Sequence, residues 1–262
     1  MSAPVTVSVV IPVRDDAVLL ERCLEALADQ SESVFEVIVV DNDSTDLTAA
    51  VAEWWGCRCV LERRPGIPAA ASAGYDAARG NVIARLDSDS VPPREWVRTI
   101  VEAFTAEPDL IAITGPGRFL GLPTPLRTLA DLVYMRAYFA VFRSLLGHPP
   151  LFGSNFALTR SAWLSARMTV HRADPEVHDD LDLSFRLPDD ARVVLEPALA
   201  VGISARPFTT PRGLARRVAR GVHTVATNRD RVRPLRAARA GASESRIRDA
   251  LRSGDRGDRM PR

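Results

Sequence analysis

Two aspartates separated by one small residue, Asp87 and Asp89, are the side chains of this sequence best suited to chemistry. They follow an apolar run, residues 82–86, that is typical of a buried strand. Alternate side chains of a strand face the same way, so we expect the two carboxylates to point together, about 7 Å apart. Adjacent carboxylates repel unless a cation lies between them, and Mg²⁺ or Mn²⁺ is the usual partner of such oxygens. The alternative is an Asx-turn before a helix cap at Ser90.

A second acidic cluster, Asp179, Asp180 and Asp182, follows His178 in a segment with helical periodicity. Acids in the first turn of a helix are favoured by its dipole, which accounts for one of them. Three within four residues exceed what capping needs. A carboxylate whose pKa is raised by like charges can act as a general base.

The elements that must position these acids alternate between strand and helix. Such an order predicts an α/β fold, a doubly wound and mostly parallel sheet flanked by helices. Ligands of these sheets lie beyond the carboxyl ends of the strands, and polar residues follow three strands here, at 12–15, 41–43 and 87–89. The predicted strands are 6–11, 35–40, 57–61, 82–86 and 110–114, with a further one starting at 153, and the helices between them include 69–79 and 93–106.

Composition indicates a soluble globular protein, with 46% hydrophobic and 26% charged residues among 262. No uncharged apolar run reaches the roughly 18 residues of a membrane-spanning helix, and the start of the chain does not resemble a secretion signal. The three cysteines have no metal-type spacing, which favours a reducing, cytoplasmic setting.

Charge is distributed unevenly along the chain. Residues 206–262 carry 16 Arg against five Asp or Glu, a local net charge of +11, whereas the whole chain has +1. We therefore expect an acidic body, residues 1–205, and a basic extension, residues 206–262, that is partly helical and disordered from about 240. The extension is suited to phosphate, to an anionic membrane surface or to nucleic acid.

The segment 126–146 has the pattern of a long amphipathic helix bearing Arg127, Arg136 and Arg143. One interpretation is a packed helix whose arginine stems cover apolar surface. The other is a face that lies on a membrane or receives a lipid-linked acceptor.

Five stretches, in order along residues 5–190, resemble glycosyltransferase family 2, whose members are inverting enzymes of the GT-A fold that use nucleotide-diphospho-sugars. They are S-V-V-I-P-V-R-D (8–15), V-I-V-V-D-N-D-S-T-D (37–46), L-D-S-D-S-V-P-P-R-E-W (86–96), G-S-N-F-A-L-T-R (153–160) and H-D-D-L-D-L-S-F-R-L (178–187). The resemblance implies a nucleotide-sugar-binding half, 1–115, and an acceptor-binding half, 116–205. It also implies a UDP- or GDP-linked donor, Mg²⁺ or Mn²⁺, and a carbohydrate or lipid-linked acceptor. The expected setting is cell-envelope polysaccharide or glycolipid synthesis in the cytoplasm, with peripheral membrane contact through the basic tail.

Site residues follow from the same resemblance, position by position. Asp180 stands where the family places its catalytic base, with Asp179 beside it, and Asp89 with Asp87 stands at the metal ligands. Sugar or acceptor contacts fall at Gly153, Ser154 and Asn155. The positions implied to bind the nucleotide-sugar are Pro12, Val13, Arg14, Asp41, Asp43, Ser72, Asp87 and Ser88.

The chain also departs from the family pattern. Arg14 and Asp15 replace the usual Tyr and Asn, and residues 70–74 lack the usual Arg and Asn. Cationic contacts to the diphosphate are expected from Arg216, Arg217 or Arg220, with no motif to choose among them.

Three other functions are less consistent with the sequence. A sugar-1-phosphate nucleotidyltransferase should have a glycine-rich basic loop after its first strand, and residues 11–14 do not form one. A nicotinamide dehydrogenase needs G-x-G-x-x-G in the same place, and that motif is absent there. A non-catalytic nucleic-acid- or anion-binding protein would depend on the arginine-rich tail, but no recognition motif accompanies it, so no specific nucleic acid is expected.

Overall fold

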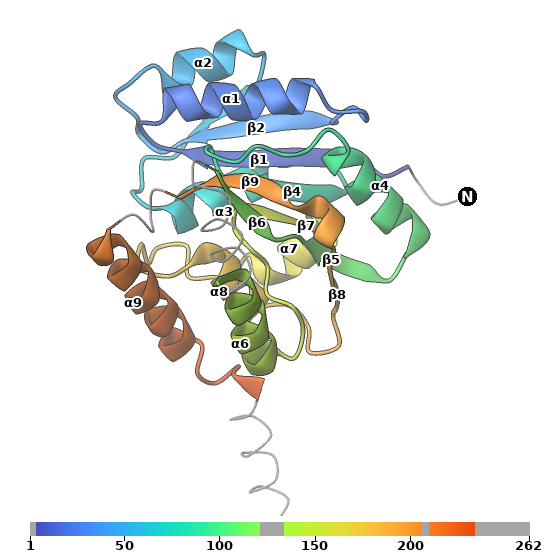
Figure 1. Ribbon diagram of the computed structural model, residues 1–262, viewed down its shortest axis with the longest axis vertical. Coiled ribbons are helices and arrows are strands. Elements are labelled where there is room, and N and C mark those ends of the chain that lie inside the picture. Colours follow the sequence, from blue (N-terminus) through green and yellow to red (C-terminus); the bar gives the residue numbers. More distant parts are fainter. Residues whose placement is uncertain (1–3, 121–133, 206–209, 234–262) are drawn as a thin grey trace, which may run out of the picture.

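The computed structural model describes residues 4–120, 134–205 and 210–233. Within them, a seven-stranded sheet has helices on both faces, and two further strands pair separately (Figure 1). The large sheet contains β1 (Val7–Val13), β2 (Glu36–Asp41), β3 (Arg58–Leu61), β4 (Val82–Leu86), β5 (Leu110–Thr114), β7 (Asn155–Thr159) and β8 (Arg192–Leu195), and the small one β6 (Gly117–Leu120) and β9 (Val201–Ser204). The helices are α1 (Ala17–Ala28), α2 (Thr48–Trp54), α3 (Ile67–Ala77), α4 (Trp96–Ala106), α6 (Arg136–Leu146), α7 (Arg160–Ala166), α8 (Asp179–Ser184), the short η2 (Pro197–Leu199) and α9 (Pro211–Thr227).

The strand order is β3-β2-β1-β4-β7-β5-β8. All neighbours in this sheet are parallel except β7, which runs antiparallel between β4 and β5. Parallel pairing of β1, β2 and β4 brings their carboxyl ends to one edge. The reversed β7 starts at that same edge, because Asn155 pairs with Leu86.

Strand periodicity divides the core between the two faces of the sheet. Val9 and Ile11 of β1 pack with α1, α2 and α4, whereas Val10 packs with α3, α7 and α8. Both faces of β1 are buried, as expected for a strand in the middle of a parallel sheet. On α1, apolar residues at helical spacing form the buried stripe: Leu20, Cys23, Leu24 and Leu27.

The predicted fold class is confirmed, and the strands agree within one or two residues. One local prediction is wrong: β4 ends at Leu86, and the Ser90 N–H donates to the Asp87 carbonyl (3.0 Å) in a turn. Strand alternation therefore does not orient Asp87 and Asp89. The predicted disorder beyond 240, and residues 126–133 of the predicted long helix, lie outside the described residues.

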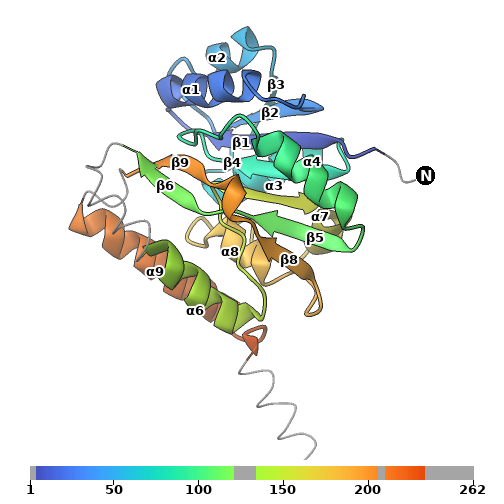
Figure 2. The same cartoon turned by 45° about the vertical axis from the view of Figure 1, so that its right-hand side comes forward.

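The basic helix α9 is fixed onto the body next to α8, and α6 lies on the same side of the molecule (Figure 2). The His178 N–H donates to the Thr224 hydroxyl (2.8 Å), and the Asn228 amide donates to Asp182 (2.8 Å). These two bonds place part of the arginine-rich extension beside the second acidic cluster. In the described part of the chain, no helix has both the length and the hydropathy that a bilayer crossing requires.

Candidate active site

A buried arginine, Arg85, lies near the carboxyl end of β4, at the sheet edge that we call the rim, and it connects the two acidic clusters. Its guanidinium donates to Asp87 (2.6 Å) and to Asp179 (2.8 Å), and its side chain is 2% exposed. The Tyr75 hydroxyl accepts a third bond at 3.1 Å. Because an unpaired buried charge is costly, the acids and the arginine must be considered as one unit.

The two acids of this unit respond to it in opposite ways. Burial opposes ionisation of Asp87, but Arg85 and the Ser154 hydroxyl outweigh it and hold the pKa of Asp87 below its ordinary value. Burial raises the pKa of Asp179, and the charges of Asp180 and Asp87 raise it further against the effect of Arg85. Pairs of carboxyls whose environments separate their pKa values are typical of catalytic sites.

Asp180 is the second residue of α8, and two backbone donors hold its carboxylate. The Gly153 N–H donates to one carboxylate oxygen (2.6 Å), and the Leu181 N–H donates to the other (2.7 Å). Its side chain is almost buried. A Cβ on Gly153 would lie 3.0 Å from the nearer Asp180 oxygen, so the absence of a side chain at 153 permits this close approach.

Of Arg216, Arg217 and Arg220, it is Arg217 on α9 whose charge interacts with Asp180 and Asp87. Burial lowers its pKa, yet Tyr134, Asp180 and Asp87 outweigh this effect and raise the pKa above the ordinary value. Arg220 instead contacts Glu176 (3.4 Å), and Arg216 is exposed. The structure therefore singles out Arg217 as the arginine that faces both acidic clusters.

The turns after β1 and β2 are tied to each other. Asp15 and Asp43 both have positive φ, and the Asp15 carboxylate accepts from the Thr45 N–H (2.7 Å). Asp41 is buried and accepts from the Ser44 N–H (2.9 Å), which fixes its carboxylate at the sheet edge.

The other predicted nucleotide-sugar residues divide by exposure. Arg14 and Asp43 are exposed at the rim, and the half-buried Ser88 hydroxyl donates to Asp16 (3.3 Å). Pro12 and Val13 are buried within β1, and Val13 belongs to the core on the α1 face. Val13 can therefore line a pocket through its backbone, and its place at the nucleotide-sugar stays a prediction.

Residues 153–155 do not act alike. Ser154 donates to Asp87 (2.6 Å), so it belongs to the site. Asn155 is fully buried; its amide donates to the Leu199 carbonyl (2.6 Å), and its oxygen accepts from the Trp96 ring nitrogen (2.8 Å). The predicted sugar or acceptor contact of Asn155 is thus corrected to a structural one.

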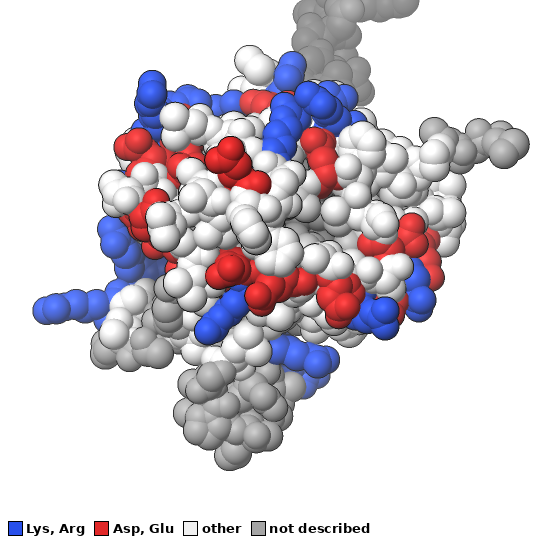
Figure 3. All heavy atoms as spheres, turned by 90° about the horizontal axis from the view of Figure 1, so that it is seen from above, with Lys and Arg blue, Asp and Glu red and all other residues white. Residues whose placement is uncertain are grey.

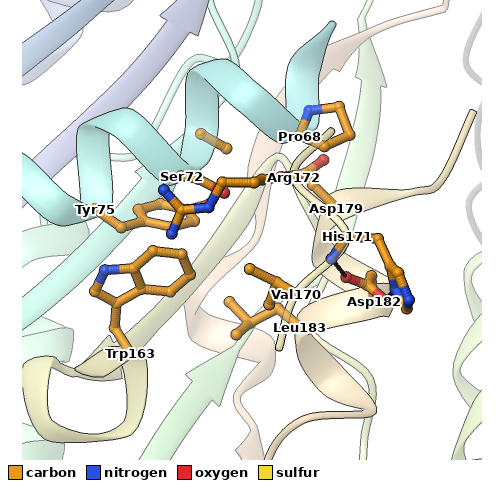
Figure 4. Close-up of a pocket in the computed structure, with 11 residues that line it drawn as sticks. Pro68, Ser72, Tyr75, Trp163, Val170, His171, Arg172, Asp179, Asp182 and Leu183 are labelled. Atoms are coloured by element: carbon orange, nitrogen blue, oxygen red, sulfur yellow. Dashed lines mark hydrogen bonds and ion pairs between the residues drawn. The ribbon is translucent and has the colours of Figure 1, made fainter. Parts of the chain in front are cut away.

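Behind Asp179 lies a small cavity of about 10 Å³, shown in Figure 4. Ser72 and Tyr75 of α3 line it from one side, and Trp163 of α7 lies next to Tyr75. This volume is close to the minimum for a single water molecule. Ser72 therefore lies near the site, but in a space too small for a sugar ring.

Figure 4 also shows His171 in contact with Asp182. The His171 ring nitrogen and the Asp182 carboxylate are 2.7 Å apart, and the His171 N–H donates to the other oxygen at 2.7 Å. Arg186, four residues further along the chain, lies 3.7 Å from the same carboxylate. The Asp182 carboxylate therefore anchors α8. In this it differs from Asp180, whose carboxylate bonds only backbone N–H groups in the described structure.

The rim has the donor chemistry for a hard divalent cation. Asp87 is 34% exposed at its side chain although each oxygen accepts one bond, and Asp89 is half-buried beside it. No cluster of three or more His, Cys, Asp or Glu side chains arranged for a metal occurs among the described residues. Mg²⁺ and Mn²⁺ fit such a site because they are held by one or two carboxylates together with substrate phosphates and water.

Sequence reasoning missed Arg85 as a site residue. The signal was present, because an arginine interrupts the apolar run 82–86 in a strand buried on both faces. A charged residue at such a position needs buried partners. Nothing local identified Asp179, 94 residues away, as one of them.

The sequence is similar to those of known proteins. The model of the family described as "Glycosyl transferase family 2" matches residues 8–167. The undecaprenyl-phosphate 4-deoxy-4-formamido-L-arabinose transferase of Pseudomonas paraeruginosa is 38% identical over 106 residues, which are 37% of this chain and 31% of that protein. The chain spans about a third of the length of the curated relatives that it matches.

Two solved structures share the fold. The mannosyltransferase PcManGT of Pyrobaculum calidifontis, in complex with GDP-Man and Mn²⁺, superposes with a TM-score of 0.61 at 19% identity, covering 97% of this chain and 80% of that one. The glucosyl-3-phosphoglycerate synthase of Mycobacterium tuberculosis, in complex with Mn²⁺, UDP-glucose and phosphoglyceric acid, gives a TM-score of 0.61 at 23% identity, covering 86% of this chain and 79% of that one. With a family match over more than half of its length and a GT-A fold, the chain belongs to glycosyl transferase family 2.

Proposed function

We propose that this protein is an inverting, metal-dependent glycosyltransferase that moves a sugar from a UDP- or GDP-linked donor to an acceptor, with Asp180 as the general base. The solved relatives hold GDP-Man or UDP-glucose with Mn²⁺, which supports a donor and a cation of these classes. The undecaprenyl-phosphate transferase among the relatives supports a role in cell-envelope glycolipid synthesis. We assign the reaction to the cytoplasmic side of the membrane, where nucleotide-sugars are available.

The observation that carries the proposal is the placement of Asp180. Two backbone N–H groups fix its carboxylate, and the positive charge of Arg217 interacts with both Asp180 and Asp87. A base and the residues that would hold the diphosphate are therefore brought to one rim from segments about 90 residues apart. Preorganised groups of this kind lower the barrier because they need no rearrangement during the reaction.

The unused lone pairs of the Asp180 carboxylate suit it to accept a proton. Each of its oxygens accepts one N–H and keeps a free lone pair, which can accept the proton of an acceptor hydroxyl. As that proton moves to Asp180, the hydroxyl oxygen attacks the anomeric carbon, and the bond to the diphosphate breaks on the opposite face. The nucleoside diphosphate leaves with the bonding electron pair, and the configuration at the anomeric carbon is inverted.

Charge on the leaving diphosphate needs compensation. Arg217 offers one fixed cation that faces Asp87 and Asp180. A divalent cation bound by Asp89 and Asp87 would supply the remaining neutralisation and hold the two phosphates in place. Arg85 cannot do this, because its guanidinium is buried and already bonded to Asp87 and Asp179.

Replacing Asp89 tests the metal assignment. In Asp89→Asn, the strengthening of UDP binding by Mn²⁺ should fall at least about tenfold, since a ligand of the cation is lost. Calorimetric titration of UDP with and without Mn²⁺ measures this directly. The control is Asp190→Asn, an exposed aspartate beyond α8 that should keep the wild-type response. If Mn²⁺ strengthens UDP binding equally in Asp89→Asn and in the wild type, Asp89 does not hold the cation.

A further inference from the structure

A groove of about 660 Å³ separates α6 from α9, and its floor includes Asp180. Figures 1 and 2 show the two helices on the side of the molecule away from α1 and α2. We call this space the α6–α9 groove. Its described lining residues are Tyr134, Ala137, Tyr138, Val141, Phe142, Leu145, Phe152, His178, Asp180, Leu181, Leu214, Arg217, Val218, Gly221, Val222, Val225 and Ala226.

The walls of the groove are hydrocarbon. Val141 on α6 and Val218 and Val222 on α9 are 53%, 59% and 65% exposed, although each faces this space. Contiguous exposed apolar surface of this kind marks a binding site more often than a free surface. Two consecutive turns of α9 present it, so the pattern is a continuous stripe.

Polar groups of the groove gather around Asp180. Arg217 is hydrogen-bonded to Tyr134 and lies within the electrostatic influence of Asp180. The Tyr138 hydroxyl is already used, since it donates to the Leu151 carbonyl (3.0 Å). A bound sugar needs several hydrogen-bonding partners along its ring, and beyond these groups the described lining offers only the His178 imidazole, one nitrogen of which already lies 3.1 Å from the Arg217 carbonyl.

The two helices carry charge of one sign. α6 carries Arg136 and Arg143, α9 carries Arg212, Arg216, Arg217 and Arg220, and neither helix contains an acid. The face over α1 and α2, at the other end of the molecule, shows acidic and basic side chains intermingled (Figure 3). An apolar groove that has Arg217 in its lining and lies between two helices whose charged side chains are all arginines is complementary to an amphiphile with a hydrocarbon tail and an anionic head.

We propose that the α6–α9 groove binds the hydrocarbon tail of a lipid-linked acceptor and directs its anionic, oxygen-bearing head to Asp180 and Arg217. This inference rests on the proposed glycosyl transfer, to which it adds the class of acceptor. The groove leads to the base because Asp180 forms part of its floor. The tail would therefore set which molecules reach the base, while the donor is held on the other side by the rim of the sheet.

Binding of n-alkyl phosphates with six, eight, ten and twelve carbons tests this inference, with each used below its micelle concentration. Calorimetry in the presence of UDP and Mn²⁺ should show the Kd falling about two- to fourfold for each added methylene, the usual gain for burying one. In the double variant Val218→Asp/Val222→Asp, this dependence on chain length should be lost. Both positions are more than half exposed, so the changes leave the core intact.

The matched control is Val18→Asp on α1, a valine that is 66% exposed and lies far from the groove. It should keep the wild-type dependence on chain length. Equal Kd values for all chain lengths in the wild type, or the same loss in Val18→Asp, would overturn the inference. A change of oligomeric state in the double variant on gel filtration would overturn it too, because the groove would then hold a second copy of the chain.

A parallel measurement separates this inference from the proposed function. Hydrolysis of UDP-glucose and GDP-mannose by water is followed on the same wild-type sample. Chain-length-dependent binding without any hydrolysis would count against glycosyl transfer but not against the groove. Hydrolysis together with Kd values that are independent of chain length would count only against the proposed role of the groove.

Discussion

Asp180→Asn is expected to lower kcat by ~10²- to 10⁴-fold, the range for losing a general base. The amide cannot accept the proton of the acceptor hydroxyl. It also has a single oxygen acceptor for the two N–H groups, of Gly153 and Leu181, that now bond the carboxylate. One buried donor loses its partner, which costs about 1–3 kcal/mol of stability. Turnover is therefore measured well below the melting temperature of the variant.

Two comparisons make the result interpretable. Asp190→Asn changes an exposed aspartate in the same part of the chain and should keep full activity and stability. Binding of UDP with Mn²⁺ to Asp180→Asn should remain close to that of the wild type, because Asp180 is placed at the acceptor and not at the nucleotide. Near-normal turnover in folded Asp180→Asn would remove the residue from the role of base.

Arg85→Met is expected to destabilise the protein by about 3–5 kcal/mol at neutral pH, the cost of breaking a buried ion pair from one side. The change leaves Asp87 and Asp179 without the guanidinium that now bonds both at 2.6 and 2.8 Å. Denaturant unfolding measures the difference. The matched control is Arg98→Met on α4, whose arginine pairs with Glu95 and Glu102 while 52% exposed, and it should cost less than about 1 kcal/mol.

The pH dependence of the Arg85 effect has a definite sign. Asp87 has a lowered pKa in the folded protein, so its contribution to stability is present above the unfolded value, near 3.9, and is lost as the pH falls through the folded value. Protonation also removes the unpaired charge in the variant. The destabilisation caused by Arg85→Met should therefore shrink as the pH is lowered toward 4. A variant as stable as the wild type at pH 7 would show that the arginine does not hold the two acids together.

The sheet was predictable because each of its strands has a local signal. Apolar β-branched runs define β1, β2 and β4, and their polar endings predict the rim on which Asp41 and Asp87 lie. The antiparallel insertion of β7 had no such signal, because strand order depends on pairing between residues far apart. That insertion determines which residues of 153–155 reach the site: Ser154 faces Asp87, whereas Asn155 is turned into the core.

A motif can name a single residue, whereas composition cannot say which of several like residues reaches the site. The family motif indicated Asp180, and the structure adds the two N–H donors that hold it. Composition indicated a basic extension without ranking Arg216, Arg217 and Arg220. Their distinction depends on how α9 is rotated against α8, which the bonds from His178 to Thr224 and from Asn228 to Asp182 determine. Helical spacing alone contains no information about that rotation.

The stereochemistry of donor hydrolysis tests the central claim most directly. With UDP-α-glucose or GDP-α-mannose and Mn²⁺, water that is activated by Asp180 should attack opposite to the diphosphate. Proton NMR within the first minutes, before the free sugar equilibrates, should then show the β-anomer accumulating first in the wild type, with the signal lost in Asp180→Asn. Initial release of the α-anomer would contradict a single inverting displacement and the assignment of Asp180 as its base.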